Sequence, residues 1–463
     1  MYKQHKRFIY FICSVSAMGG LLFGYDWVVI GGAKPFYEVY FGISDNPSQQ
    51  GLAMSIALIG CLAGAMTAGR LADRIGRKPL LTAAAFIFLL SAYGTGAFDA
   101  YTWFLVWRLV GGVAIGIASG LSPMYIAEIA PPATRGKLVS INQLTIVIGI
   151  LAAQVANYLI AEPVAAGLTE APLDSWNCQW GWRWMFWAEA FPAGAFLILT
   201  FFIPESPRWL DMKGREKEAL LTYERIGGKA YAESQLAELL AARPAATPER
   251  QNGVGGRRYR RVLILGIVLA VFQQWCGTNV IFNYAQEIFA DAGFDIGEML
   301  FNIVLTGVIN VVFTFVAIYT VERLGRRRLI LIGAGGLAII YLLLGTGYLM
   351  HLTGFVMVIP VIAAIACYAM TLGPVTWVLL AEIFPDRVRA AGMAVCTFML
   401  WSACFLLTYT FPLLNSALGS YGTFWIYSTI CVAGYIFFTL RLPETKSKSL
   451  NEIEHELIND KIL

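Results

Sequence analysis

The chain has 463 residues, of which 58% are hydrophobic and only 14% are charged, and its formal net charge is +4. Soluble globular proteins carry about 25% charged residues, so this composition excludes an ordinary soluble domain and predicts a protein that crosses the membrane many times. Nucleic-acid binding is also not expected, because it would need a soluble basic domain and the sequence has none.

Twelve apolar stretches are long enough to cross a hydrocarbon core of roughly 30 Å as helices. Helices are expected because only helices and closed barrels satisfy the backbone polar groups in lipid. The sequence therefore predicts an all-α membrane protein. The predicted spans are 8–32, 51–70, 79–98, 101–126, 137–160, 184–203, 262–290, 299–321, 329–350, 355–381, 390–413 and 422–442.

The interior of the chain repeats itself. Ala127–Pro131 returns as Ala381–Pro385, and Asp73–Lys78 returns as Glu322–Arg327. Such repeats are typical of transporters built from two similar halves, with a substrate site between the halves near the middle of the bilayer. We expect two pseudo-symmetric six-helix bundles at 1–203 and 262–442, a short helical cytoplasmic segment at 204–261 and a cytoplasmic tail at 443–463.

The basic residues fix the expected orientation. If both termini are cytoplasmic, all of the Lys and Arg residues except Lys34, Arg108 and Arg183 fall in the tails or in cytoplasmic connections. Cytoplasmic loops of membrane proteins carry this excess of positive charge. We therefore expect a multi-pass protein with both termini in the cytoplasm.

Few charged side chains lie deep inside the predicted spans, and the candidates are Asp26 in the first, Arg108 in the fourth and Glu189 in the sixth. Each costs about 2.5 to 3.5 kcal/mol to insert, and such residues persist mainly in cavities or in pairs. A carboxylate beside an Arg that keeps its proton can alternate between an ion pair and a neutral acid, which would couple transport to protons. A static buried ion pair that only fixes helix packing is the alternative.

Uncharged polar residues gather in other spans, together with aromatic residues. Amides both donate and accept hydrogen bonds, so a group of them suits a neutral ligand that carries many hydroxyls. Each amide could instead be a hydrogen bond between helices, worth about 0.6 to 2 kcal/mol. The residues in question are Gln143, Gln273, Gln274, Asn279, Asn310, Trp377 and Trp401.

An enzyme is not expected. The sequence outside the predicted spans has no Ser/His/Asp set, no phosphate-binding loop and no constellation of metal ligands. We predict no cofactor and no metal.

Six motifs together resemble one family, the sugar porters of the major facilitator superfamily, and the resemblance covers essentially the whole chain. Within that family the chain is most similar to bacterial proton-coupled xylose symporters. The motifs are Gly69–Lys78, Arg108 with Gly112 and Gly116, Pro123–Glu128, Pro204–Arg208 with its counterpart Pro443–Lys446, Gln273–Gln274 and Gly373–Trp377.

The resemblance implies specific roles for the polar residues. Asp26 is the carboxylate that takes up the proton, Arg108 is its partner, and Glu189 competes for Arg108. Facilitative glucose carriers of the family have Asn at the position of Asp26, which favours symport over simple facilitation here. The sugar-binding residues implied are Gln143, Gln273, Gln274, Asn279, Asn310 and Trp377, with Trp401 nearby and Phe23 and Tyr284 close to the cavity.

The repeated charged motifs are expected to form a cytoplasmic latch. Ion pairs between the halves would hold the outward-facing state and break on inward opening. The alternative is that the basic residues only set the topology. The residues of this predicted latch are Asp73, Arg74, Arg77, Glu128, Arg135, Glu322, Arg323, Arg326, Glu382 and Arg389.

Four departures from the family pattern leave the sugar open. Ile150 and Leu400 stand where the xylose symporters have Gln, Asn283 replaces the first Tyr of a Tyr-Tyr pair, and Cys404 replaces an Asn of the glucose facilitators. We predict a proton-coupled symporter for a pentose or hexose. A facilitative sugar uniporter and a non-transporting sugar sensor are the alternatives.

The expected partners are a monosaccharide, a proton and the lipid bilayer, with no nucleic acid. No protein partner is required on this interpretation, and the chain is expected to act as a monomer. The resemblance to bacterial members places it in the inner (plasma) membrane.

Overall fold

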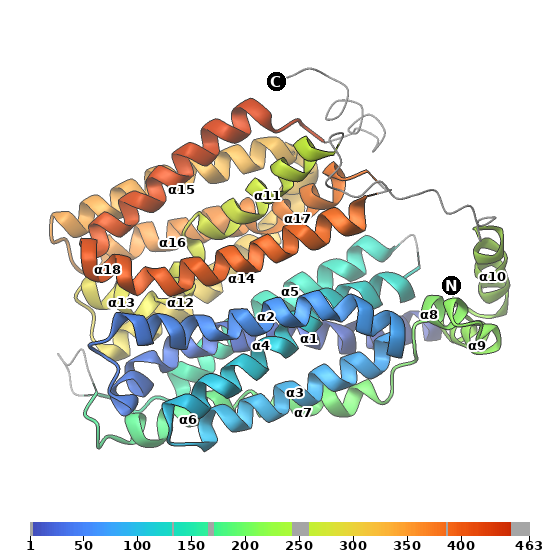
Figure 1. Cartoon of the computed structure of the whole chain (residues 1–463), viewed down its shortest axis with the longest axis horizontal. Helices are drawn as coiled ribbons and strands as arrows, with labels where there is room; N and C mark the ends of the chain where they lie inside the picture. Colours follow the sequence, from blue (N-terminus) through green and yellow to red (C-terminus); the bar gives the residue numbers. More distant parts are fainter. Residues whose placement is uncertain (1–2, 132–133, 165–170, 243–258, 386–387, 446–463) are drawn as a thin grey trace. The chain divides into compact units, whose positions relative to one another are not determined.

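The structure is a computed structural model that describes residues 3–131, 134–164, 171–242, 259–385 and 388–445. All regular structure within these ranges is helical (Figure 1). The all-α prediction is therefore confirmed. The predicted tail beyond residue 445, residues 243–258 of the predicted linker and the side chain of Glu322 lie outside the described part.

The first half of the chain supplies six membrane-crossing segments. The sixth is not one long helix: a turn at residues 188 and 189 divides it into two short helices. A π-helical turn, Asn177–Gly181, precedes it. The helices are α1 Lys3–Phe41, α2 Pro47–Ile75, α3 Arg77–Ala97, α4 Tyr101–Ile129, α5 Arg135–Ile160, α6 Trp182–Trp187 and α7 Ala190–Thr200.

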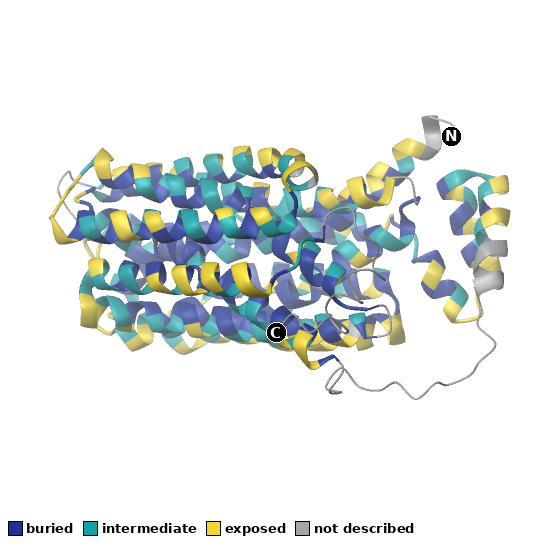
Figure 2. Cartoon of the chain, turned by 90° about the horizontal axis from the view of Figure 1, so that it is seen from above, coloured by how far each residue is buried: buried dark blue, intermediate teal, exposed yellow. Residues whose placement is uncertain are grey.

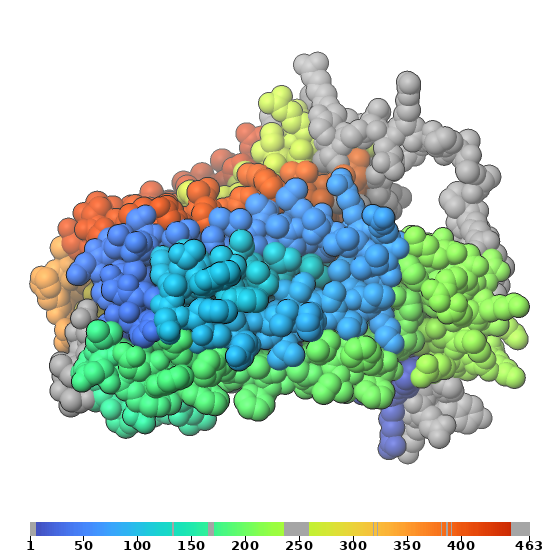
Figure 3. All heavy atoms as spheres, turned by 60° about the horizontal axis from the view of Figure 1, so that its bottom comes forward, coloured from blue at the N-terminus to red at the C-terminus, as the bar shows by residue number. Residues whose placement is uncertain are grey.

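Three short helices follow: α8 Pro207–Met212, α9 Glu216–Gly227 and α10 Lys229–Ala242. The α8 helix starts here because Pro207 occupies its first turn and the Ser206 hydroxyl accepts a hydrogen bond from the Trp209 backbone N–H at 3.3 Å. The Trp209 indole donates to the Asp73 carbonyl at 3.0 Å, which ties α8 to the end of α2. Figure 3 shows the residues of these helices, coloured green to yellow-green, as one group. The predicted short helical segment between the bundles is confirmed.

The second half of the chain again supplies six membrane-crossing segments. Two of them are interrupted, one formed by α11–α13 and one by α16 and α17. The helices are α11 Arg260–Trp275, α12 Thr278–Asn283, α13 Ala285–Asp291, α14 Ile296–Leu324, α15 Arg326–Leu349, α16 Phe355–Met370, α17 Leu372–Ile383 and α18 Arg389–Arg441.

Ten helical segments among the described residues are long and apolar enough to cross a membrane. One of them, α18, contains Gly419 with a non-helical φ of 67° and therefore holds two predicted spans. The predicted span 184–203 corresponds to α6 and α7, each too short to count alone. All twelve predicted spans are thus present as helices.

Two predicted spans are broken near the middle. Gly277, with φ of 88°, separates α11 from α12, and Thr371 separates α16 from α17. A positive φ of this kind is readily adopted only by glycine. Broken membrane helices free backbone groups in places where a ligand can use them, and transporters bind substrates at such points.

Many large apolar side chains are exposed on the helices, and Figure 2 shows exposed and intermediate residues along them. Leu159, Phe191 and Phe355 are each more than 70% exposed. Water would penalise such a surface, whereas lipid tails accept it, so the exposure agrees with a multi-pass membrane protein.

Contacts between residues divide the chain into two compact units. The first comprises Met1–Trp27, Gly60–Ile150 and Phe186–Gln251, and the second comprises Val28–Ile59, Leu151–Met185 and Asn252–Leu463. The division cuts through α1, α2, α5 and α6, so parts of these helices pack with the second half of the chain. The predicted bundle boundaries at residues 203 and 262 follow the sequence repeat instead and stay a prediction.

The N-terminus of α14 offers a test of local stability. Asp295 and Glu298 form a reciprocal capping box there, with the Asp295 carboxylate accepting from the Glu298 N–H at 2.9 Å. We expect Asp295→Ala to reduce stability by about 1 kcal/mol, because an orphan N–H loses its partner. Thermal unfolding of purified protein in detergent measures the change. Asp295→Asn, which keeps an acceptor, is the control and should retain most of the stability; equal loss in both variants would contradict the capping account.

Candidate functional site

The first element of the site is an ion pair between α1 and α4. Arg108 and Asp26 pair through Nη1 and Oδ1, and Arg108 Nη2 also donates to the Asp26 backbone carbonyl at 3.3 Å. Each residue is 2% exposed. Both belong to the first unit. Because two buried charges without partners would be costly, the pairing explains how both side chains are accommodated inside the unit.

The close approach of α1 to α4 depends on a small residue. A Cβ at Gly111 would meet the Ser91 hydroxyl of α3 first and would lie 2.9 Å from Asp26 Oδ2. Gly111 follows Arg108 by three residues and so lies on the same face of α4. On the other side, the Arg108 guanidinium lies 5.5 Å from the centre of the Phe186 ring. Glycine and an aromatic ring together shape the space around the pair.

Glu189 completes the charged cluster. It lies at the turn between α6 and α7, is 2% exposed, and interacts electrostatically with both Asp26 and Arg108. Within the described residues, Asp26 Oδ2, Arg108 Nε and Glu189 Oε1 are buried without a hydrogen-bond partner. The structure thus brings the three predicted residues together, with Asp26 paired to the guanidinium and Glu189 buried near both.

The second unit holds a chain of amides at the end of α11. The Gln273 amide donates to the Tyr368 hydroxyl at 2.8 Å, and Gln274 donates to Gln273 Oε1 at 2.6 Å. Asn279, just beyond the break at Gly277, donates to Gln274 Oε1. Because of the helix break, Gln273 and Gln274 lie on α11 whereas Asn279 lies on α12. These groups form a continuous row of donors and acceptors.

The other predicted sugar-binding residues of the second unit have different environments. Asn310 on α14 and Trp401 on α18 are buried, whereas Trp377 on α17 is 37% exposed. The Tyr284 hydroxyl donates to the Thr408 carbonyl at 2.6 Å. Its ring packs 4.5 Å from that of Phe411. Tyr284 therefore serves packing in this conformation.

Gln143 on α5 and Phe23 on α1 lie in the first unit and are half-buried. That they share one site with the amides of the second unit stays a prediction.

The charged motif of the first unit forms a compact cluster. Arg77 at the start of α3 pairs with Glu128 at 3.0 Å and with Asp73 at 3.1 Å. The Glu205 carboxylate accepts from the backbone N–H groups of Arg77 at 3.0 Å and Lys78 at 3.2 Å, which caps α3. Burial raises the pKa of Glu205, and these backbone donors oppose that effect.

The second unit repeats this cluster with its own residues. Arg326 at the start of α15 pairs with Glu382 at 3.1 Å, and Glu444 accepts from the Arg326 N–H at 3.0 Å. The Thr445 hydroxyl donates to Glu382 at 2.6 Å, as the Ser206 hydroxyl does to Glu128. The sequence repeat is therefore a repeat of contacts.

The remaining residues of the predicted latch are more peripheral. Arg74, Arg135 and Arg323 are exposed at helix ends. Arg389 Nε donates to the Phe384 carbonyl at 3.2 Å. The pairs described above each join residues of a single unit, so a latch between the halves stays a prediction.

Comparison with known proteins identifies the family. A family profile described as "Sugar (and other) transporter" matches residues 12–457. The chain belongs to the sugar transporter family. The sugar porter resemblance inferred from the motifs is therefore confirmed. The family's fold is present here as twelve helical spans in two bundles.

Relatives within the sugar transporter family match over nearly their whole length. The D-xylose-proton symporter of Escherichia coli strain K12 is 36% identical, with 98% of this chain and 96% of that protein covered. The arabinose-proton symporter of Bacillus subtilis is 35% identical, with coverages of 96% and 94%. A solved inward-open structure of the E. coli xylose transporter is 34% identical and superimposes with a TM-score of 0.84, covering 97% of this chain and all of that one.

Two residues near these clusters were not predicted as site residues. The Tyr368 hydroxyl accepts the hydrogen bond from Gln273. Its position in an apolar span could have indicated a polar partner, because a buried phenol needs one. Lys34 was noted only as one of the basic residues outside the cytoplasmic connections. It is 1% exposed and lies between two carboxylates.

Substituting Gly111 tests the packing around the ion pair. We expect Gly111→Ala to displace the Ser91 hydroxyl and the Asp26 carboxylate and to destabilise the protein by about 1 to 3 kcal/mol, the usual cost of overpacking. Gly120→Ala on the same helix is the control, because a Cβ there meets nothing within 4 Å. Thermal unfolding in detergent compares the two. An equal effect of both substitutions would show that Gly111 is not needed for this contact.

Proposed function

We propose that this sugar transporter is a proton-coupled symporter that imports a neutral monosaccharide by alternating access. The observation that carries the proposal is the buried Asp26–Arg108 pair, with Glu189 beside it as a second carboxyl group for the same guanidinium. An ionisable cluster inside a membrane span is the usual mark of an ion or proton pathway.

The arrangement supports a simple coupling cycle. When Asp26 binds a proton it becomes neutral and no longer holds Arg108. Arg108 keeps its own charge at any working pH, so it turns toward Glu189, the neighbouring carboxyl group. Loss of the proton restores the pair with Asp26. Each exchange of partners forms or breaks the ion pair between α1 and α4. In this way the proton controls how these two helices are held together.

The amide row supports a sugar as the cargo. Gln273, Gln274 and Asn279 offer both donors and acceptors, which match hydroxyl groups and not a charged ligand. The printed names of the relatives include xylose, arabinose and glucose as substrates. We therefore propose a pentose or hexose, bound by these amides with Asn310 and Trp377, and with Gln143 from α5.

The proposal includes the orientation and the latch. Both termini, α8–α10 and the clusters around Arg77 and Arg326 face the cytoplasm of a bacterial cell, with the protein in the inner membrane. The clusters exchange partners between the halves when the inner end closes. One chain suffices for this cycle.

Coupling would make accumulation possible. One proton moving down 100 mV releases about 2.3 kcal/mol, and each tenfold sugar gradient costs about 1.4 kcal/mol. Voltage alone could therefore sustain roughly a 40-fold accumulation of sugar. A facilitative uniporter could sustain none.

The decisive variant is Asp26→Asn. We expect it to abolish uphill uptake into proteoliposomes under an imposed proton gradient, because the amide cannot take up and release a proton. Exchange of labelled for unlabelled sugar should remain, since the amide row is unchanged. Asp174→Asn, at an exposed loop position, is the control and should transport like the parent. Uphill uptake by Asp26→Asn would rule out its role in coupling and favour facilitated diffusion with Asp26–Arg108 as a structural pair.

A further inference from the structure

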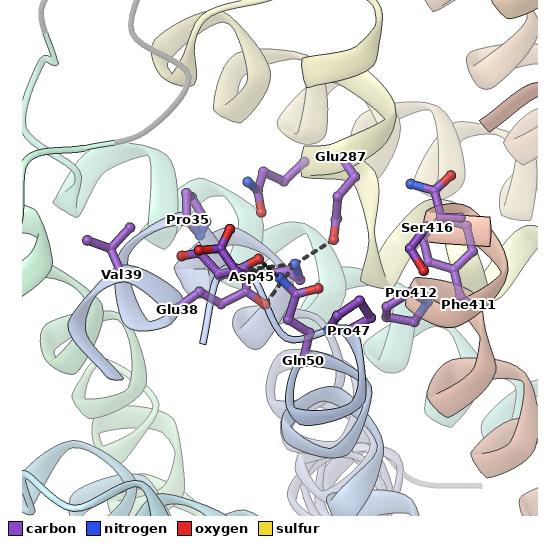
Figure 4. A pocket seen from close by; sticks show the side chains of 14 residues that line it. Pro35, Glu38, Val39, Asp45, Pro47, Gln50, Glu287, Phe411, Pro412 and Ser416 are labelled. Carbon is purple, nitrogen blue, oxygen red and sulfur yellow. Dashed lines mark hydrogen bonds and ion pairs between the residues drawn. The ribbon is translucent and has the colours of Figure 1, made fainter. Parts of the chain in front are cut away.

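A second buried ion cluster lies at the opposite end of α1 from the N-terminus. Lys34 is 1% exposed, and its ammonium lies 2.8 Å from Glu38 on the same helix and 2.5 Å from Glu287 on α13. All three side chains line one pocket, and Figure 4 draws the interactions of Glu38 and Glu287 as dashed lines. All three residues belong to the second unit.

The surroundings of Lys34 are polar and acidic. The Tyr284 ring lies 5.8 Å from the ammonium, and the Gln50 amide donates to Glu38 at 3.4 Å. Asp45 lines the same cavity, whose volume is about 310 Å³. One ammonium thus faces three carboxylates, of which two bind it directly. The Lys34–Glu38 contact stays within one helix, whereas the Lys34–Glu287 contact joins two helices from different halves of the chain.

Other contacts close the same end of the unit. A Cβ at Gly31 would lie 3.1 Å from the Phe282 carbonyl, so α1 approaches the backbone of α12 closely. The Ser48 hydroxyl lies 3.0 Å from the Tyr409 hydroxyl, which joins α2 to α18. The far ends of α1 and α2 are therefore packed against α12, α13 and α18. Among these contacts, Lys34–Glu287 is the ion pair.

We infer that Lys34 and Glu287 form an ion lock that holds this end of the transporter closed and that must break whenever the end opens. The inference rests on the proposed alternating access, because only a transporter that opens at both ends needs such a lock. Glu38 makes the lock reversible. When Glu287 moves away, Glu38 on the same helix keeps Lys34 paired, so the buried ammonium is not left without a counter-charge. Glu287 meanwhile becomes exposed to water.

A distance measurement tests the lock without relying on transport. Spin labels are placed on cysteines introduced at Asn46 and Ala417, two exposed positions at this end, and the distance distribution is measured in proteoliposomes. In Glu287→Gln, the ratio of open to closed protein should rise about tenfold, which corresponds to about 1.4 kcal/mol, near the lower measured coupling of a close charge pair. The parent protein without added cysteines gives the background from its eight native cysteines.

Two further variants decide the interpretation. Asp45→Asn removes an exposed carboxylate from the rim of the same cavity and should leave the distribution unchanged. The exchange variant Lys34→Glu with Glu287→Lys should return it toward the parent distribution. The lock is refuted if Glu287→Gln shows the parent distribution, or if Asp45→Asn shifts it equally. A transporter that shows the predicted shift but no uphill uptake would retain the lock and lose only proton coupling.

Discussion

Proton coupling in this transporter would depend on one buried interaction, the pairing of Asp26 with Arg108. Inside a membrane protein, neither charge can be left alone, so each conformation must provide a partner for both. Gly111 lets the carboxylate reach α4, and Glu189 offers the guanidinium a second partner. Because Arg108 retains its charge, the proton on the carboxyl group decides which partner it takes. That dependence is what can turn a static helix contact into a coupling device.

Other ion clusters of the chain also hold a cation against carboxylates. Around Arg77 and Arg326, the same contacts between a guanidinium, a glutamate and a hydroxyl occur in each unit. Glu205 caps the start of α3, and Glu444 caps the start of α15. In the second unit, Lys34 lies between Glu38 and Glu287. The clusters of Arg77 and Lys34 each contain two carboxylate partners for the cation, which lets a contact exchange without exposing a bare charge.

Much of the fold could be predicted from the sequence because its strongest signals are local. Apolar stretches define the twelve spans, and the repeated motifs define the two halves. The breaks at Gly277 and Thr371 could not be placed by hydropathy, because an interrupted helix is as apolar as an intact one. The turn that divides the predicted span 184–203 into α6 and α7, with Glu189 in it, could not be placed for the same reason.

The candidate site was predicted in part, for a related reason. Asp26, Arg108 and Glu189 stood out because charges are rare in spans, and the structure does bring them together. Tyr368 and Lys34 did not stand out, because their importance lies in partners that are 95 and 253 residues away in sequence. Such pairings depend on how helices pack, which residue types and spacing do not specify.

The most direct test of the central claim is sugar-driven proton movement. Purified protein in sealed vesicles, with the membrane potential clamped at zero and a pH dye inside, receives an inward gradient of a transported pentose or hexose. The account predicts acidification of the interior that follows sugar entry and disappears in vesicles without protein. Sugar entry with no change in internal pH would contradict it, because the carboxyl group of Asp26 would then complete its cycle without carrying a proton.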